Sequence, residues 1–318
     1  MPIPARAHFC WIGPTLSWAH AFAVLSAAAQ AGLDEVILHH TDELAPTPAL
    51  AALRAAPGVI LAHINPLEIL HQAEVKLALE GQLTALYHRL ASPVQRADML
   101  RAAILYLQGG IYLDLDTITI APLRPLLGAT QFIGQEYIVW PHWVRASRSP
   151  LVWGRHLALD LLRKALRLAP GGWRGFRRVE HWYFPGVNNA VMGATPGASL
   201  FAAYLRAMAT LPPGAQVPPY ALGPDMLQSL IARFTPAELV IHPPAIFYPL
   251  PPEISEHWFR PSRPGALARA LRPQTLVVHW YASVRSKPHV AVIDPAFIRA
   301  HRESQLFSAL VSTALPQL

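Results

Sequence analysis

The sequence predicts an α/β protein with a mostly parallel sheet that is flanked by helices. Short apolar segments rich in β-branched residues alternate with helical stretches over the first 125 residues, which is the pattern of repeated βα units. The chain has 318 residues, of which 53% are hydrophobic and 14% are charged. This composition excludes a disordered chain and allows one large core. We therefore expect a single domain with two lobes.

The first βα unit lies in a stretch without charged side chains, residues 7–33. We expect a buried strand at His8–Ile12, a turn at Gly13-Pro14 and a helix at Ser17–Ala31. The turn divides the stretch and alanine dominates the helix, which argues against a membrane span or a signal peptide. The sequence therefore predicts a cytoplasmic protein.

The later elements continue this pattern with shorter apolar segments. Strands are expected at Glu35–His40, Val59–Ile64 and Thr275–Tyr281. Helices are expected at Leu151–Leu168, Ala198–Thr210, Met226–Phe234 and Ala296–Leu310. The sequence contains neither GxGxxG nor a P-loop, so it gives no support to a dinucleotide fold or a P-loop NTPase. With Cys10 as its single cysteine, the chain cannot form an internal disulfide.

The most informative segment runs from a helix directly into a strand. Ser92 is a suitable N-cap and Pro93 suits the first helical position. Gly109 and Gly110 end the helix, and the buried strand Ile111–Leu113 follows at once. The strand therefore delivers the next few residues to the carboxyl end of the sheet, where α/β proteins bind ligands.

Two carboxylates follow this strand. Asp114 and Asp116 are two residues apart, so in an extended chain their side chains share one patch. Two negative charges this close are unfavourable without a cation, which indicates a divalent metal with oxygen ligands. Asp98 and Arg101 lie on one face of the preceding helix, and Arg101 could reach a phosphate there. The alternatives are an exposed acidic turn and a surface ion pair.

Taken together, these residues resemble the DXD-containing sugar-transferase family. This family includes yeast initiating mannosyltransferases, bacterial capsule and lipopolysaccharide transferases and, more distantly, the clostridial glucosylating toxins. The specific match is Asp98-Met-Leu-Arg101 followed by Gly109-Gly-Ile-Tyr-Leu-Asp-Leu-Asp116. Four further segments resemble the family in the expected order: His8–Gly13, Val187–Ala194, Gly223–Asp225 and Val277–Trp280. The resemblance spans nearly the whole chain.

The resemblance implies a GT-A-like fold and a retaining transfer of a hexose from a nucleoside diphosphate sugar, with Mn²⁺ or Mg²⁺ as cofactor. The donor would be a UDP- or GDP-hexose. The acceptor would be a glycan, a lipid-linked glycan or a protein, in bacterial surface polysaccharide synthesis. Residues 1–125 would bind the donor, and residues 126–318 would bind the acceptor and supply a late metal-ligand strand. The alternative is a catalytically inactive nucleotide-sugar or glycan-binding module with the same fold.

The resemblance also implies roles for individual residues. The implied metal ligands are Asp116, Asp114 and His279. The implied donor-binding residues are Trp11, which would contact the base, and Asp98, Arg101, Tyr112, Asp114 and Lys287. The implied catalytic residues are Asp116, Asp114, Asp225 and Asn189. Trp11 and His279 could instead be core residues, and Asn189 and Asp225 could instead have capping roles.

The chain departs from the family after the late histidine. Many relatives have a Ser-Trp pair there, whereas Ser283, Ser286 and Lys287 follow in this sequence, so Lys287 or Arg285 would replace the missing diphosphate contact.

The formal net charge of +7 suits an anionic partner, but the arginines are scattered and form no known nucleic-acid motif, so we expect no nucleic-acid partner. The segment Trp173–Arg178 mixes aromatic and cationic residues, which suggests either a solvated loop or peripheral contact with the inner face of the membrane. Segments 140–185 and 212–222 are expected to determine acceptor specificity.

Overall fold

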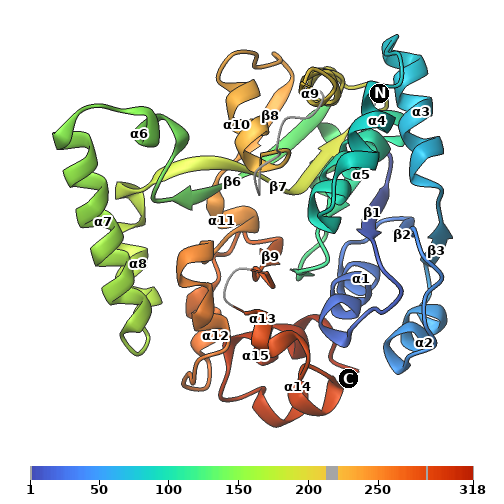
Figure 1. The fold of residues 1–318 in the computed structure, drawn as a ribbon. Helices are drawn as coiled ribbons and strands as arrows, with labels where there is room; N and C mark the ends of the chain where they lie inside the picture. Colours follow the sequence, from blue (N-terminus) through green and yellow to red (C-terminus); the bar gives the residue numbers. More distant parts are fainter. Residues whose placement is uncertain (1, 213–220, 284–285, 318) are drawn as a thin grey trace.

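A seven-stranded sheet forms the centre of the computed structural model, which describes residues 2–212, 221–283 and 286–317 (Figure 1). Its strands are β1 (Arg6–Trp11), β2 (Glu35–His40), β3 (Val59–His63), β4 (Gly110–Leu113), β6 (Gln131–Ile138), β7 (Phe184–Ala194) and β8 (Leu239–His242), in the order β3-β2-β1-β4-β7-β6-β8. Within this described sheet, β7 runs antiparallel to its neighbours β4 and β6, and all other neighbours pair in parallel. The predicted α/β fold with a mostly parallel sheet is confirmed.

Helices cover both faces of the sheet (Figure 1). One face packs against α3 (Pro66–Leu77), α4 (Gln82–Arg89), α5 (Pro93–Gln108), α9 (Ser199–Ala209) and α10 (Pro224–Ile231). The other packs against α1 (Trp18–Gln30), α2 (Pro48–Ala55) and α11 (Pro244–Phe247). In β4, Tyr112 belongs to the first apolar cluster, whereas Ile111 and Leu113 belong to the second. Because both faces are buried, this central strand is apolar throughout.

A third apolar cluster joins the C-terminal part of the chain to α1. It includes side chains of α12 (Ala266–Ala270), α14 (Pro295–His301) and α15 (Leu306–Ala314) together with Phe22 of α1. The remaining helices are α6 (His142–Ala146), α7 (Pro150–Leu168), α8 (Trp173–Val179) and α13 (Lys287–Val290), with 3₁₀ turns η1 (Arg124–Gly128), η2 (Glu180–Trp182) and η3 (Pro252–Trp258). The C-terminal elements thus pack against the first βα unit of the chain.

The uncharged stretch near the N-terminus forms β1 and α1, as the sequence predicts. Most of α1 is buried, with Phe22 and Val24 inaccessible to solvent, so its apolar character reflects core packing. In the described part of the chain, none of the helices has the length and apolar character needed to cross a membrane.

Two late elements differ from the prediction. The expected helix Ala296–Leu310 is two helices, α14 and α15. The chain is held at the break because Gln305 bridges to Pro261 and its side-chain amide donates to the carbonyl of Phe259. The expected strand Thr275–Tyr281 is reduced to β9 (Val277–His279), which pairs with β5 (Thr117–Thr119) outside the main sheet.

The segment Trp173–Arg178 is not a solvated loop. It lies in α8, where Trp173 and Phe176 are 4% and 1% exposed because they pack into the third apolar cluster. The aromatic residues that suggested membrane contact therefore face the interior of the protein.

Strands from residues 1–125 and from residues 126–318 join in one sheet where β4 pairs with β7. The division of donor and acceptor binding between these halves stays a prediction.

Candidate functional site

A pair of glycines positions the DXD segment in the middle of the sheet. Gly109 caps the end of helix α5 with a φ of 65°, and Gly110 begins β4 with a φ of 101°. Residues with an L side chain rarely adopt these φ values. A Cβ at Gly110 would also lie 2.8 Å from atoms of Arg6 and His8. The glycines therefore allow the helix to reverse directly into the strand. Ser92 is the N-cap residue of α5 as predicted, although its side chain makes no capping hydrogen bond within the described part of the chain.

Asp114 and Asp116 come together through a turn, and not through the extended chain that the sequence suggested. The carbonyl oxygen of Asp114 accepts from the backbone N–H of Thr117 at 3.1 Å and from its hydroxyl at 2.7 Å. Strand β5 begins at this threonine and pairs with β9, where His279 lies directly opposite Thr117. We call the turn from Asp114 to Thr117 the DXD turn. The second sheet brings His279, which lies 163 positions after Asp116, to this turn.

Asp114, Asp116 and His279 form a group that fits a divalent metal ion. Each offers a ligand atom, and these atoms lie within 4.8 Å of one another. Nε2 of His279 lies 2.8 Å from Oδ1 of Asp116, whereas its buried Nδ1 has no hydrogen-bond partner among the described residues. Two carboxylates and an imidazole are a donor set suited to Mn²⁺ and, through the carboxylates, to Mg²⁺. The predicted metal ligands are thus assembled in one place.

The surroundings of Asp116 stabilise its ionised form. Burial raises the pKa of Asp116, but the imidazole of His279 and the backbone N–H of Ala282, 2.8 Å from Oδ2, hold this pKa at about 2. Burial lowers the pKa of His279, and Asp116 outweighs this effect and raises it. A negatively charged oxygen is therefore available to a cation at neutral pH.

Arg101 holds Asp114 in place from the other side. Its guanidinium makes a bidentate contact, with Nη2 at 2.9 Å from Oδ1 and Nη1 at 3.0 Å from Oδ2 of Asp114. It also donates to the carbonyl of Asn189 and lies 3.4 Å from Oδ1 of Asp98. The hydroxyl of Tyr112 donates to Oδ1 of Asp114 at 3.0 Å. Arg101 and Tyr112 therefore orient this carboxylate directly.

The charges of this group depend on one another because all are shielded from water. Burial lowers the pKa of Arg101, but Asp114, Tyr112 and Asp98 more than offset this and keep it above its usual range. Burial raises the pKa of Asp98 to about 6, although Arg101 and Asn189 oppose the shift. Asn189 donates from Nδ2 to Oδ1 of Asp98 at 2.7 Å. The network is thus a buried, mutually compensating set of charges.

The DXD turn lies at the border of two cavities. The smaller, about 200 Å³, is lined by Trp11 and His20, whose ring centroids are 4.8 Å apart, and we call it the Trp11 cavity. The larger, about 370 Å³, is lined by Glu136, and we call it the Glu136 cavity. Both cavities are bordered by Val94, Arg101, Asp114, Asp116 and Ser283. The candidate metal ligands Asp114 and Asp116 are therefore accessible from both cavities.

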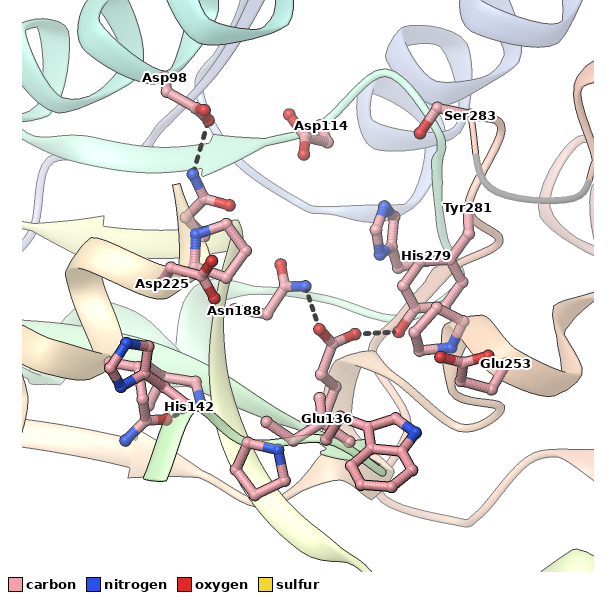
Figure 2. Close-up of a pocket in the computed structure, with 18 of the residues that line it drawn as sticks. Asp98, Asp114, Glu136, His142, Asn188, Asp225, Glu253, His279, Tyr281 and Ser283 are labelled. Carbon is pink, nitrogen blue, oxygen red and sulfur yellow. Dashed lines mark hydrogen bonds between the residues drawn. The ribbon is translucent and has the colours of Figure 1, made fainter. Parts of the chain in front are cut away.

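Glu136 was missed by the sequence reasoning. It comes from β6, is 6% exposed, and accepts hydrogen bonds from the Tyr281 hydroxyl at 2.6 Å and from Nδ2 of Asn188 at 2.8 Å (Figure 2). Burial raises its pKa, and both hydrogen bonds oppose the shift. A single acidic residue in the apolar run Phe132–Ile138 was the available signal. Tyr281, two residues after His279, could have been found by its spacing from that histidine.

The other predicted site residues differ in whether they line one of the two cavities. Asn189 and the exposed Asp225, the second residue of α10, both line the Glu136 cavity. Trp11 ends β1 and lines the cavity named after it. Lys287 is the exposed first residue of α13, and among the described residues it lines neither cavity. Arg285, like positions 213–220 of the expected acceptor segment, lies outside the described residues.

Comparison with known families agrees with this geometry. Residues 40–133 match the family described as "Glycosyltransferase sugar-binding region containing DXD motif". This part of the chain therefore resembles a glycosyltransferase sugar-binding region. The predicted resemblance and the predicted enzyme class, a glycosyltransferase, are thereby confirmed. The matched segment contains α5 and the DXD turn, but neither Trp11 nor His279. No curated protein matches the chain.

Solved structures similar to this chain include three that are named as transferases. The PaToxG glycosyltransferase is 16% identical over 73% of this chain and 70% of its own, with a TM-score of 0.45. Mouse xyloside xylosyltransferase 1, in its apo form, is 15% identical over 87% of this chain and 98% of its own, with a TM-score of 0.47. The apo WbbM bifunctional glycosyltransferase is 10% identical over 99% of this chain and 50% of its own, with a TM-score of 0.49.

Proposed function

We propose that this chain transfers a hexose, with retention of configuration, from a UDP- or GDP-hexose to a glycan, lipid-linked or protein acceptor. The observation that carries the proposal is the Asp114, Asp116 and His279 group at the border of two cavities. These three residues would hold Mn²⁺ or Mg²⁺. The bound ion would act as a Lewis acid that stabilises the negative charge on the leaving nucleoside diphosphate.

The Trp11 cavity suits the nucleotide. The half-buried indole of Trp11 offers an aromatic face, against which a base of any kind can stack. Ser283 borders both cavities, so its hydroxyl can donate a hydrogen bond to a diphosphate that lies between them. Arg101 and Tyr112 support this arrangement by keeping Asp114 oriented toward the border.

The Glu136 cavity suits the acceptor. Its lining carries the carboxylates of Glu136, Asp225 and Glu253, which accept hydrogen bonds from hydroxyl groups. Asp225 is exposed, so its carboxylate can contact an acceptor hydroxyl directly. Glu136, in contrast, already accepts hydrogen bonds from Tyr281 and Asn188. The assignment of retention rests on the sequence resemblance to retaining transferases.

We also propose that the reaction serves bacterial surface polysaccharide synthesis at the cytoplasmic face of the membrane. Lipid-linked acceptors are available there, and the chain has no described helix that could cross the membrane itself. Within this setting the protein would act as a peripheral enzyme.

The test of donor binding is a thermal-shift panel with UDP, GDP, CDP and dTDP sugars, each with and without Mn²⁺. A ligand present at one hundred times its dissociation constant stabilises a protein by about 2.7 kcal/mol, which is readily detected. We expect one nucleotide to stabilise the wild type only with Mn²⁺, and Asp116→Ala to lose this effect. Glu43→Gln, which changes an exposed carboxylate outside both cavities, should behave as the wild type. Failure of every nucleotide to shift a folded protein would contradict the proposal.

Turnover and stereochemistry need a second measurement. The anomeric configuration of the product, followed by NMR with the donor found above, should equal that of the donor sugar. Inversion would contradict the retaining mechanism. Metal-dependent binding without hydrolysis or transfer, across a panel of acceptors, would instead favour the inactive binding module.

A further inference from the structure

Helix α7 exposes several large apolar side chains while it buries polar ones. It lies at the outer edge of the molecule, in the part formed by α6, α7 and α8 (Figure 1). The side chains of Leu157, Leu161 and Leu168 are 51%, 57% and 65% exposed. The polar residues His156 and Asp160 of the same helix are only 2% and 5% exposed. The leucines are four and seven residues apart, so they form one stripe along the helix.

The polar side of α7 is held against the rest of the protein. Arg163 pairs with Asp160 and with Glu253 of η3. His156 contacts the carbonyl of Val139 through Nδ1 at 2.7 Å, and Nε of Arg167 lies 3.8 Å from Glu256. These buried contacts set the rotation of the helix, and with this rotation Leu157, Leu161 and Leu168 face outward.

An exposed tryptophan extends the stripe toward the beginning of α7. Trp153 is 42% exposed and lies four residues before Leu157. We call Trp153, Leu157, Leu161 and Leu168 the α7 apolar face. Trp143 of the neighbouring helix α6 is also 48% exposed. Contiguous exposed apolar side chains of this size, rimmed by polar groups, mark interaction surfaces.

The charged groups around this face are cationic. Within residues 139–182, all of which the structure describes, the exposed charged side chains are Arg145, Arg148, Arg155, Lys164, Arg174 and Arg178. The two acidic residues of this range are both paired with cations, Asp160 with Arg163 and Lys164, and Glu180 with Arg272. The exposed charged side chains in this part of the chain are therefore all positive.

We propose that the α7 apolar face docks on an anionic lipid membrane. Leucine and tryptophan side chains on one side of a helix, bordered by arginine and lysine, are the features of helices that lie in the membrane interface. The leucines would enter the boundary between headgroups and acyl chains, and the arginines would contact the anionic headgroups. A second copy of this chain fits the face less well, because the two sets of cations would repel each other.

The docked face lies next to the Glu136 cavity. Trp140 lines this cavity, and its ring centroid is 5.3 Å from that of Trp153. His142 and Arg145 of α6 line the same cavity. An acceptor carried by the membrane would therefore enter the cavity close to the lipid surface, a step that rests on the proposed function.

The test is flotation of the full chain with vesicles. We expect binding to vesicles of phosphatidylglycerol and phosphatidylcholine, and much weaker binding to phosphatidylcholine alone. Leu157→Gln/Leu161→Gln should weaken binding by about tenfold or more per leucine, since each replacement removes a large apolar side chain from the contact. The matched control is Val75→Gln/Val292→Gln, which changes two valines that are 67% and 56% exposed elsewhere and should bind as the wild type.

A second set of variants tests how much the positive charges contribute to membrane binding. Arg148→Gln and Arg178→Gln should each weaken binding to anionic vesicles by about fivefold, and added salt should weaken wild-type binding. All variants should keep the wild-type melting temperature, because the replaced side chains are exposed.

Several outcomes would overturn the docking proposal. One is wild-type protein that does not bind anionic vesicles but whose melting temperature still rises with nucleotide and Mn²⁺. This result would leave the proposed function intact. Another is a leucine double variant that binds vesicles as tightly as the wild type. A third is a wild-type dimer in sedimentation that the double variant abolishes, since a second copy would then cover the face. Vesicle binding without any nucleotide shift would support docking and contradict the proposed function.

Discussion

The Trp11 cavity and the Glu136 cavity meet at Asp114 and Asp116 but are built in different ways. The lining of the Trp11 cavity comes from the first 116 residues, with only Ala282 and Ser283 added from elsewhere. The Glu136 cavity draws on α5, β6, α6, β7, α10, η3 and the residues around β9. The first is largely local in sequence, whereas the second exists only after distant segments have packed together.

The chemistry of the two linings differs as well. Apart from the shared border, the Trp11 cavity has no lining Asp, Glu, Lys or Arg among the described residues. The Glu136 cavity adds four acidic residues, Asp98, Glu136, Asp225 and Glu253, and one cation, Arg145. An aromatic, mostly apolar lining suits a nucleotide base, and an acidic lining suits hydroxyl groups. Substitutions at the border should therefore affect both ligands, and substitutions within one cavity should affect only one.

The largest effect is expected at the border. Asp116→Ala removes a charged metal ligand and should lower kcat/KM by roughly a thousandfold or more, because the metal supplies several kcal/mol of stabilisation to the transition state. Donor binding and turnover should both fall, as measured by calorimetry and by a product assay with saturating Mn²⁺. Activity in Asp116→Ala within tenfold of the wild type would mean that the DXD turn does not hold the metal.

The next effect is on folding. Arg101→Met leaves Asp98 and Asp114 buried without their cation and should lower the free energy of unfolding by about 3 kcal/mol at pH 8, measured by urea denaturation. Arg101→Lys should recover part of this loss. A fully stable Arg101→Met would show that the two carboxylates are compensated from elsewhere.

The pH dependence of that variant sharpens the same point. Burial already raises the pKa of Asp98 to about 6 when Arg101 is present, so removing the cation raises it further. An aspartate whose pKa is higher in the folded than in the unfolded state favours folding at low pH, and this contribution is lost as the pH rises through the folded pKa. The deficit of Arg101→Met should therefore be smaller at pH 5 than at pH 8. A deficit independent of pH would contradict the buried-charge explanation.

A smaller effect, on acceptor kinetics but not on donor binding, is expected in the Glu136 cavity. Glu136→Gln removes the negative charge and reverses one hydrogen bond, because the amide oxygen can still accept from Nδ2 of Asn188 while the amide NH₂ group faces the Tyr281 hydroxyl, which must then accept. We expect the acceptor kcat/KM to fall by about tenfold to a hundredfold, with the donor dissociation constant unchanged. Tyr281→Phe, which removes one donor to Glu136, should change acceptor kinetics in the same direction. Loss of donor affinity in either variant would break the separation of the two cavities.

The smallest effect is expected in the Trp11 cavity. Trp11→Ala should weaken binding of the nucleoside diphosphate by about tenfold, the size of one base–aromatic stacking contact, and Trp11→Phe should recover most of it. Titration calorimetry with Mn²⁺ gives the comparison. Equal binding by Trp11→Ala and wild type would identify Trp11 as a core residue only.

Much of the DXD side could be predicted because its residues are close in sequence. Helix α5, the two glycines, β4 and the pair of aspartates form one continuous segment, in which helix capping, backbone freedom at glycine and burial each have a local signature. Even here, the turn that joins Asp114 to Asp116 was considered only as an alternative to an extended chain, since it depends on pairing between β5 and a distant strand.

The acceptor side shows why the remainder could not be predicted. Glu136, Asn188 and Tyr281 come from three separate strand regions, and their hydrogen bonds exist only because β6 pairs with β7 and the chain after β9 returns to the sheet. Likewise, the periodicity of α7 predicts an amphipathic helix but not which side faces outward. The buried pairing of Arg163 with Asp160 and Glu253 decides that.

The sequence by itself determined the α/β class, the βα unit at the N-terminus, and the carboxylates that end the central strand, because each depends on residues within a few turns of chain. Only the tertiary structure showed that β9 lies outside the main sheet and places His279 beside Asp116, and that Leu157, Leu161 and Leu168 of α7 face solvent. Both depend on contacts between segments far apart in the chain, whose free energy appears only when the whole core has packed.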